Sequence, residues 1–152
     1  MNFMIIVTDL SKRISYNYFI KCKYEAGIVL LGWEVKCIRI SGINLVGSFV
    51  SINNFLDVVL IGTFINSNNF VFNYSNIDSS RNRNLLLKKK ELLHLYSSLK
   101  IKGYTLIPSK AYWKGSFLKI EVSLCFGKKL YDKRQILKNR DLNINLNDGL
   151  IN

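Results

Sequence analysis

Residues 118–124 alternate strictly between apolar and polar side chains, and this pattern constrains the fold more than any other feature of the chain. The apolar positions are Leu118, Ile120, Val122 and Leu124, and the polar positions between them are Lys119, Glu121 and Ser123. Successive side chains of a strand point to opposite faces, so the pattern predicts a strand with one buried face and one wet face. Gly115, just upstream, predicts a hairpin turn. The chain should therefore contain an antiparallel sheet that buries one face.

Four further segments are expected to supply strands. Residues 15–24 and 27–30 mix aromatic and β-branched side chains around a Glu-Ala-Gly break, and they predict two short strands. Residues 48–52 and 55–61 predict a hairpin that turns at the Asn-Asn pair between them. Strands of this length and spacing, with two helices inserted, are typical of a small closed or partly closed β-barrel.

One short helix is expected near residue 35. Leu31, Val35 and Ile38 recur at the spacing of a single helical face, and Gly42 follows as a C-terminal cap. Glu34 lies off this apolar stripe. We therefore expect its carboxylate to face solvent or a ligand.

A second helix is expected over residues 88–102. Leu92, Tyr96 and Leu99 line one face, and Gly103 follows as a stop signal. The preceding residues 66–84 are rich in Asn and Ser and have no sustained period. They predict a long surface loop.

The chain carries a large positive charge that is unevenly distributed. Its 22 Lys and Arg residues against 10 Asp and Glu residues give a net charge of +12, which suggests a polyanionic partner. Residues 1–87 contribute 8 basic and 5 acidic side chains, whereas residues 88–152 contribute 14 and 5. Contacts with phosphate are therefore expected mainly in the second half of the chain.

The composition divides the chain into a folded domain and two terminal segments. We expect an N-terminal extension at residues 1–14, a β-barrel domain at residues 15–126, and a basic C-terminal tail at residues 127–152 that is flexible when free. The last part of the tail, residues 141–152, is dominated by Asn and Leu. We expect little helix there, because Asn is a weak helix former.

Several protein classes are disfavoured by what the sequence lacks. The single histidine, His94, lies in a lysine-rich segment, and the sequence contains no nucleophile motif or phosphate-binding glycine loop, so we expect no enzyme, metal or cofactor. Cys22, Cys37 and Cys125 lack the spacing of a zinc site or a disulfide framework and are expected to be reduced thiols. The longest apolar run, residues 58–65, is shorter than the ~20 residues that span a bilayer. Without a signal-peptide pattern at its start, the chain is expected to be cytoplasmic and to have no membrane partner.

Basic residues are interleaved with aromatic ones in three places. The basic clusters are Arg81 with Arg83, residues 88–90 and residues 128–134, and the nearby rings are Phe70, Phe72 and Tyr131. Cations bind phosphate through counterion release, and rings stack on unpaired bases, a combination that suits RNA loops better than regular duplex. We therefore expect an RNA-binding protein, with Arg81 and Arg83 in an exposed loop.

Four segments, read in order, resemble the motifs of the SmpB family. They are YFI, EAGIVL and GWEVK within residues 18–36, RNRNLLL at residues 81–87, KGYTLIP at residues 102–108, and GKK with YDKR at residues 127–134. The resemblance covers about residues 16–140. The order and spacing of the four motifs make it specific.

The resemblance implies an oligonucleotide-binding-type antiparallel β-barrel with two or three short helices. The barrel would bind the tRNA-like domain of transfer-messenger RNA, and the tail would enter the small-subunit decoding centre of stalled ribosomes. A monomer is implied, with alanyl-tRNA synthetase and elongation factor Tu as indirect partners. The implied RNA-binding residues are Tyr24, Glu34, Lys36, Arg39, Asn44, Arg81, Arg83, Leu86, Lys88, Lys128 and Lys129. The implied ribosome-directed residues are Tyr131, Asp132, Lys133 and Arg134.

Two other functions fit parts of the pattern. A ribosomal or initiation-type structural RNA-binding protein would share the basic barrel, but it would co-purify with bulk ribosomal RNA instead of one small tRNA-like species. A peptidyl-tRNA hydrolase that rescues ribosomes directly would use a Gly-Gly-Gln loop. That tripeptide does not occur in the sequence.

Overall fold

The computed structural model describes residues 4–67 and 77–149, of which residues 130–132 and 144–149 are described by their backbone alone. The described strands are β1 (Met4–Asp9), β2 (Tyr18–Ile28), β3 (Phe49–Ile52), β4 (Val58–Ile61), β5 (Arg83–Leu86), β6 (Tyr104–Lys114) and β7 (Phe117–Gly127). The described helices are α1 (Ser11–Asn17), α2 (Gly32–Ser41), α3 (Lys89–Leu99) and α4 (Leu130–Gly149). We expected two or three helices, and the described residues contain four.

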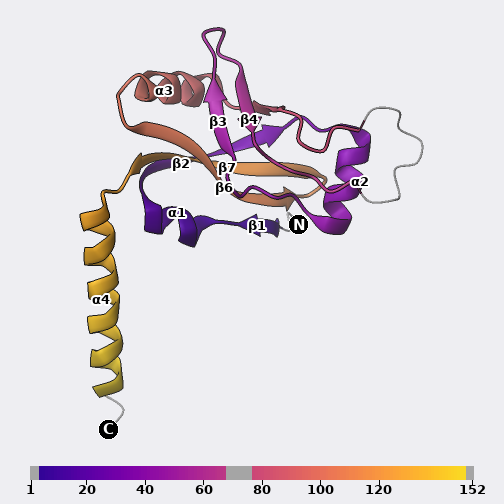
Figure 1. Cartoon of the computed structure of the whole chain (residues 1–152). Coiled ribbons are helices and arrows are strands. Elements are labelled where there is room, and N and C mark those ends of the chain that lie inside the picture. The colour runs from indigo at the N-terminus through magenta and orange to yellow at the C-terminus, as the bar shows by residue number, and fades with distance from the viewer. Residues whose placement is uncertain (1–3, 68–76, 150–152) are drawn as a thin grey trace.

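The strands form one antiparallel sheet that closes on itself (Figure 1). Their order is β1-β6-β3-β4-β5-β2-β7, and β6 also pairs with β7. The strands from β2 to β7 therefore make a ring, and β1 lies outside it, paired with β6. The predicted mainly β, antiparallel fold is confirmed.

The long hairpin of β6 and β7 carries the alternation that first indicated a sheet. Its turn includes Gly115, whose φ of +64° lies in the left-handed region that favours glycine. All four apolar residues of the alternating run are at most 4% exposed, and they pack with Leu60 and Leu106 inside the ring. The hairpin and its buried face were predicted correctly. On the predicted wet face, Ser123 is fully buried, and its hydroxyl donates to that of Ser109 at 3.1 Å.

Strand β2 runs without interruption through the Glu-Ala-Gly segment, so the predicted pair of short strands is wrong. Gly27 pairs with Leu86 of β5 and with Lys119 of β7, which places it where two neighbouring strands meet β2. An added Cβ at Gly27 would lie 3.5 Å from the Cβ of Leu86. That distance is an ordinary van der Waals contact, so the junction has room for a small side chain. Gly27 lies inside the strand and does not end it.

Three elements differ from the predicted secondary structure. β1 and the first part of α1 lie within the expected N-terminal extension, and residues 15–17 of α1 are helical where a strand was predicted. The backbone N–H of Leu10, between β1 and α1, donates to the carbonyl of Ser109 on β6 at 2.7 Å. β5 lies at the end of the expected long loop, where it pairs with β2 and β4. Residues 68–76 of that loop, including Phe70 and Phe72, lie outside the described residues. A four-residue strand is too short to show a period in the sequence.

Both predicted helices are present, and the buried side of α2 differs from the prediction. Gly42 follows α2 with a φ of +75°, which confirms the predicted cap. Ile38 is buried as predicted, but Leu31 is 48% exposed and Val35 is half-buried. Trp33 and Cys37 complete the buried side. α3 confirms the second helix, with Leu95 at the centre of its buried side.

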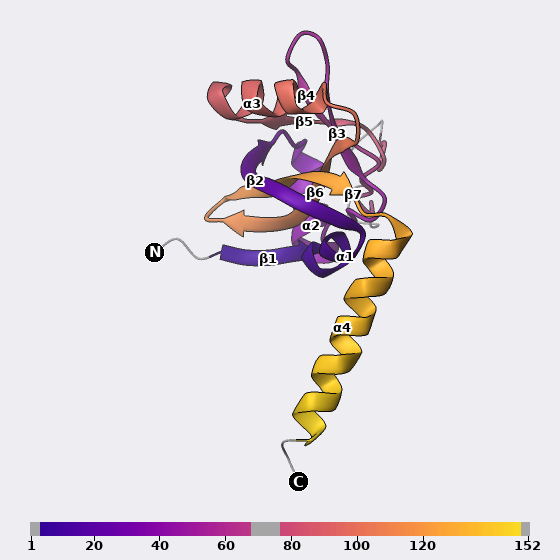
Figure 2. The ribbon, with the colours of Figure 1, turned by 90° about the vertical axis from the view of Figure 1, so that its left-hand side faces the viewer.

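The C-terminal tail forms a helix, which corrects the expectation of little helix beyond residue 141. Figures 1 and 2 show α4 projecting away from the sheet, with α1 beside its first turns. Residues 130–140 are rich in Leu, Lys and Arg, which favour helix, and the helix continues through the Asn-rich part to Gly149. None of the helices in the described part of the chain combines the length and apolarity that crossing a bilayer requires.

The cysteines are free, as predicted. Cys37 and Cys125 are buried and Cys22 is half-buried. Burial raises the pKa of the Cys125 thiol to about 11. This side chain is therefore a packed, protonated thiol at neutral pH.

A buried ionic network fixes α2 against the sheet. The carboxylate of Glu34 on α2 is fully buried. It accepts hydrogen bonds from Nε of Arg83 at 2.9 Å, from Nε of Arg81 at 2.8 Å and from Nη2 of Arg81 at 2.6 Å. It also accepts the backbone N–H of Leu31 at 2.8 Å. The predicted orientation of Glu34 towards solvent is therefore wrong, because two arginines outweigh the cost of removing one carboxylate from water.

Arg83 is the centre of this network. Its guanidinium is fully buried and also donates to Thr63 Oγ1 at 2.8 Å, to the carbonyl of Arg81 at 3.0 Å and to the carbonyl of Ser79 at 3.1 Å. Burial lowers the pKa of Arg83, and the charge of Glu34 opposes this shift. The expectation that Arg83 lies in an exposed loop is wrong, whereas the Arg81 side chain remains 27% exposed.

We predict that Arg83→Ala lowers the free energy of unfolding by about 3–5 kcal/mol, because it leaves Glu34 buried with one cation fewer. Arg81→Ala should cost less, about 1–3 kcal/mol, because water can reach its position. Urea denaturation followed by circular dichroism measures both values. Lys88→Ala removes an exposed cation and serves as the control. If Arg83→Ala unfolds at the urea midpoint of the control, the network does not stabilise the fold.

Candidate nucleic-acid interface

Two of the predicted RNA-binding residues, Glu34 and Arg83, have no surface to offer an RNA. Both are fully buried, and each Glu34 oxygen already accepts two hydrogen bonds. Arg81 is the member of the network with an exposed part. The sequence named all three residues, but it could not show which of them faces outward.

An exposed apolar and aromatic groove of about 400 Å³ lies where β2, β5 and the tip of the β6–β7 hairpin meet. Leu86, the predicted RNA-binding residue on β5, is 63% exposed beside Gly27. Phe117 is 70% exposed at the hairpin tip, and Trp113 and Lys119 complete this side of the groove. Rings that can stack on bases thus lie next to a cation that can bind phosphate.

Trp113 also borders a second groove, of about 600 Å³, between α2 and β1. The guanidinium of Arg39 lies 5.4 Å from the centroid of the Trp113 ring, within the range of a cation–π contact. Lys36 precedes Arg39 by three residues, so both cations lie on the same side of α2. We define the Trp113 face as Lys36, Arg39, Leu86, Trp113, Phe117 and Lys119.

Half of the Trp113 face was missed by sequence reasoning, namely Trp113, Phe117 and Lys119. The two rings flank the predicted turn at Gly115. Large aromatic residues on both sides of an exposed turn are a readable signal, because a hairpin tip cannot bury both of them fully. Trp113 is half-buried against the core, and Phe117 is exposed.

Tyr24 and Lys88 lie at a separate place, beside α3. The Tyr24 hydroxyl is 3.1 Å from Nδ1 of His94, and the two rings form an edge contact with centroids 6.1 Å apart. Burial raises the pKa of Tyr24, so its hydroxyl is neutral and available as a hydrogen-bonding group. Lys88 is exposed immediately before α3. α3 and α2 lie at opposite ends of the sheet in Figure 1, so these residues are apart from Lys36 and Arg39.

Asn44 holds a turn of the backbone. Its Oδ1 accepts the N–H of Val46 at 3.0 Å, and its backbone pairs with Phe64 through hydrogen bonds of 2.9 and 3.1 Å. The residue is exposed, but its side-chain oxygen is already engaged. Asn44 therefore shapes the loop that leads into β3.

The root of the tail is fastened to the start of the chain. Lys128 donates from Nζ to the carbonyl of Ser15 at 2.6 Å and lies 4.8 Å from the centroid of the Phe19 ring. Its backbone N–H donates to the carbonyl of Asn17 at 3.1 Å. Lys129 and Arg134 are exposed and Lys133 is half-buried, while the side chains of Tyr131 and Asp132 lie outside the described residues.

Comparison with known proteins gives one consistent result. A family model described as SmpB protein matches residues 9–150. An SsrA-binding protein from Geotalea uraniireducens is 43% identical over 132 residues, which cover 87% of this chain and 86% of that protein. An SsrA-binding protein from Borreliella afzelii is 41% identical over 132 residues, which cover 87% of each chain.

A solved structure agrees with these relatives. It is described as "tmRNA-SmpB: a journey to the center of the bacterial ribosome", and one of its chains is 36% identical to this one. The match has a TM-score of 0.60 and covers 76% of this chain and 80% of that chain. The family match spans the whole ring of strands and reaches the end of α4. The chain therefore belongs to the SmpB family.

Proposed function

We propose that this protein binds the tRNA-like domain of transfer-messenger RNA and delivers it to stalled ribosomes, so that incomplete peptides are tagged and the ribosomes are released. The protein acts by binding and not as an enzyme. The observation that carries this proposal is the Trp113 face, where the exposed ring of Phe117 and the half-buried ring of Trp113 lie with three cations on a protein of net charge +12. The SsrA-binding relatives and the tmRNA-SmpB structure support the same partner.

The Trp113 face is suited to an RNA that exposes both phosphates and unpaired bases. Lys36, Arg39 and Lys119 supply charge, and Phe117 supplies a stacking surface. Leu86 adds an apolar contact beside them. Tyr24 and Lys88, beside α3, extend this contact along a large RNA.

Glu34, Arg81 and Arg83 contribute to RNA binding in different ways. Glu34 and Arg83 are positioning residues, because their network holds α2 and therefore sets where Lys36 and Arg39 project. Arg81 contacts RNA with its exposed edge. Asn44 supports the neighbouring loop.

The closed ring of strands is best described as an oligonucleotide-binding-type barrel followed by a C-terminal tail. Residues 15–126 form its RNA-binding domain, residues 1–14 precede it, and residues 127–152 form a tail that is flexible in the free protein and ordered on the ribosome. The tail contacts the small-subunit decoding centre through Tyr131, Asp132, Lys133 and Arg134. Lys128 and Lys129 lie where barrel and tail meet.

The remaining partners follow from the same proposal. Transfer-messenger RNA is charged by alanyl-tRNA synthetase and carried by elongation factor Tu, so both are indirect partners. The protein acts in the cytoplasm as a monomer. The main alternative is a ribosomal or initiation-type structural RNA-binding protein, which would carry bulk ribosomal RNA through purification.

We predict that Arg39→Ala with Lys119→Ala weakens binding of transfer-messenger RNA and flattens its salt dependence. Each phosphate contact removed should lower the log–log slope against salt concentration by ~0.7–0.9. Lys12→Ala with Lys138→Ala removes the same charge from exposed positions elsewhere and is the matched control. A gel-shift titration at several salt concentrations measures both. Equal losses of RNA affinity in the two double variants would mean that net charge, and not the Trp113 face, drives binding.

We predict that truncation after Lys129 leaves the barrel folded and able to bind transfer-messenger RNA, because the truncated chain keeps every strand and the Lys128 contacts with α1. Peptide tagging should fail. Tyr131→Ala, and Lys133→Ala with Arg134→Ala, should show the same split. A thermal melt, a gel shift and a reconstituted tagging assay on one preparation test this. Normal tagging by the truncated chain would contradict the proposed role of the tail. Loss of RNA binding in step with tagging would contradict the assignment of RNA binding to the barrel.

A further inference from the structure

The side chain of His94 on α3 is held by a residue of β2 and still faces solvent. The hydroxyl of Tyr24 lies 3.1 Å from Nδ1 of His94, and the two rings form an edge contact with centroids 6.1 Å apart. Tyr24 is half-buried against the core, whereas His94 is exposed. The imidazole is therefore the part of this pair that a ligand can reach.

The same hydrogen bond determines which nitrogen of the neutral imidazole carries a proton. Burial raises the pKa of Tyr24, so its hydroxyl keeps its proton at neutral pH. Among the described residues, this hydroxyl has no acceptor other than Nδ1 of His94, and an unsatisfied donor in a half-buried place is unfavourable. The hydroxyl therefore donates to Nδ1, which leaves the imidazole proton on Nε2. Nε2 makes no hydrogen bond within the described part of the chain.

His94 follows the cationic first turn of α3. Residues 88–90 are three exposed lysines, and Lys90 precedes His94 by four residues, so their side chains lie on the same side of the helix. Glu91 is half-buried, and its carboxylate accepts the backbone N–H of Lys88 at 3.3 Å. The acidic group is thus engaged at the start of the helix, and the exposed surface before His94 attracts anions.

The ionisable groups that face His94 come from α3 and β2. On α3 they are Lys90 and Glu91, whose opposite charges act on the imidazole in opposite directions. On β2 they are Tyr24 and the half-buried Cys22 beside it. β6 also packs against α3, but none of its described side chains forms a hydrogen bond or ion pair with His94. A bound anion would therefore decide which charge state the ring adopts.

We propose that Nε2 of His94 binds a phosphate of transfer-messenger RNA, and that Tyr24 is the positioning residue that holds the imidazole for this contact. The inference rests on the proposed function, in which the RNA extends from the Trp113 face to α3. Lys90 binds the same phosphate or the adjoining one.

This contact couples RNA binding to the uptake of one proton. A phosphate favours the charged imidazole, because a hydrogen bond between two ions is stronger than one to a neutral donor. Tyr24 supports both charge states, since its hydroxyl can accept from Nδ1 once that nitrogen is protonated. The imidazole is the side chain that normally changes charge between pH 5 and 8. RNA affinity therefore rises as the pH falls from 8 to 6.

The test compares the full chain with its variants in gel shifts with transfer-messenger RNA at pH 6 and pH 8. The unaltered chain should bind about 3- to 10-fold more tightly at pH 6, because one proton is taken up at its single histidine. His94→Gln places a neutral amide N–H near the position of Nε2, so it should keep the affinity at pH 8 and lose the pH response. His94→Ala should lose about 2- to 10-fold in affinity at pH 8, as expected for one neutral hydrogen bond. Tyr24→Phe should weaken binding and keep the pH response.

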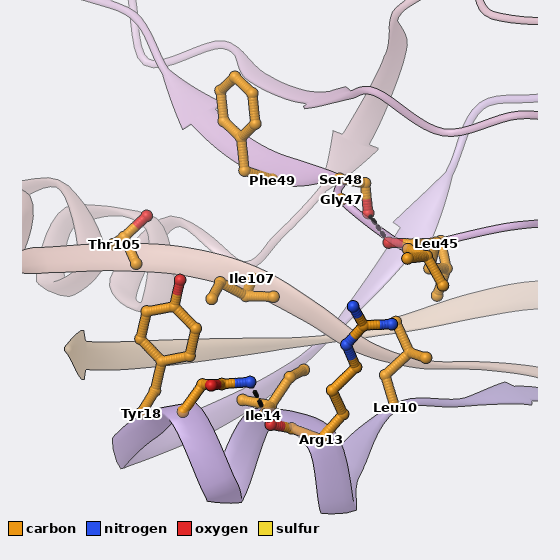
Figure 3. A pocket seen from close by; sticks show the side chains of 12 residues that line it. Leu10, Arg13, Ile14, Tyr18, Leu45, Gly47, Ser48, Phe49, Thr105 and Ile107 are labelled. Atoms are coloured by element: carbon orange, nitrogen blue, oxygen red, sulfur yellow. Dashed lines mark hydrogen bonds between the residues drawn. The ribbon is translucent and has the colours of Figure 1, made fainter. Parts of the chain in front are cut away.

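Arg13→Ala is the matched control for the loss of a cation. Arg13 is exposed beside a groove between α1 and β6 (Figure 3), and α1 and α3 lie on opposite sides of the sheet (Figures 1 and 2). Its removal should leave the pH response unchanged. A pH response that persists in His94→Gln, or one that Arg13→Ala abolishes equally, would overturn the proposal.

Nuclear magnetic resonance of the imidazole nitrogens tests the site without transfer-messenger RNA. In the free protein at pH 8 the proton should lie on Nε2, and Tyr24→Phe should give a mixture of both neutral forms. A short single-stranded RNA should shift the Nε2 resonance. A proton on Nδ1 in the unaltered chain would overturn the role of Tyr24, and an unshifted Nε2 resonance would overturn the phosphate site. If the unaltered chain binds no transfer-messenger RNA while the short RNA still shifts Nε2, the proposed function fails and the phosphate site stands.

Discussion

The structure depends on one buried ionic interaction, the carboxylate of Glu34 between the guanidinium groups of Arg81 and Arg83. A lone charge inside a protein is strongly unfavourable, and a buried pair is tolerated only when its remaining hydrogen-bonding positions are satisfied. This cluster meets that condition, because Leu31, Thr63 and Ser79 complete its hydrogen bonds. The cluster joins α2 to β5 and to the segment that follows β4. β5 otherwise meets its neighbours through short pairings with β2 and β4, and α2 meets the sheet through its apolar side.

The consequence of this interaction is the position of α2. Its buried side holds Trp33 and Ile38 against the core, and its outer side then carries Lys36 and Arg39 towards the tip of the β6–β7 hairpin. The long hairpin is rigid for a different reason, since its inner face is filled with apolar side chains. A cationic helix and an aromatic hairpin tip are thus brought together by two independent parts of the core. The other end of the molecule, around α1, fastens the tail and carries its own groove.

The sequence predicted those helices and strands in which the alternation of apolar and polar residues runs over several turns or residue pairs. The alternation at residues 118–124, the helix at residues 88–102 and the cap at Gly42 were all predicted correctly. β5 was not predicted, because it has only four residues and begins at the end of a polar loop. β2 was predicted as two strands, because a glycine usually marks a break, whereas Gly27 lies inside the strand where β5 and β7 both pair with it. The sequence could not show which of the candidate site residues face outward. Glu34 and Arg83 were named but placed outside, because no local pattern shows that distant charges neutralise one another. Trp113 and Lys119 were missed, because they join the site only when the hairpin reaches α2.

We propose that transfer-messenger RNA lies on the Trp113 face. Lysine acetylation, read by mass spectrometry with and without the tRNA-like domain of that RNA, measures this directly. Bound RNA should protect Lys36 and Lys119 from acetylation and leave Lys12 and Lys138 as reactive as in the free protein. Unchanged reactivity at Lys36 and Lys119 in a saturated complex would contradict the claim and place the RNA elsewhere.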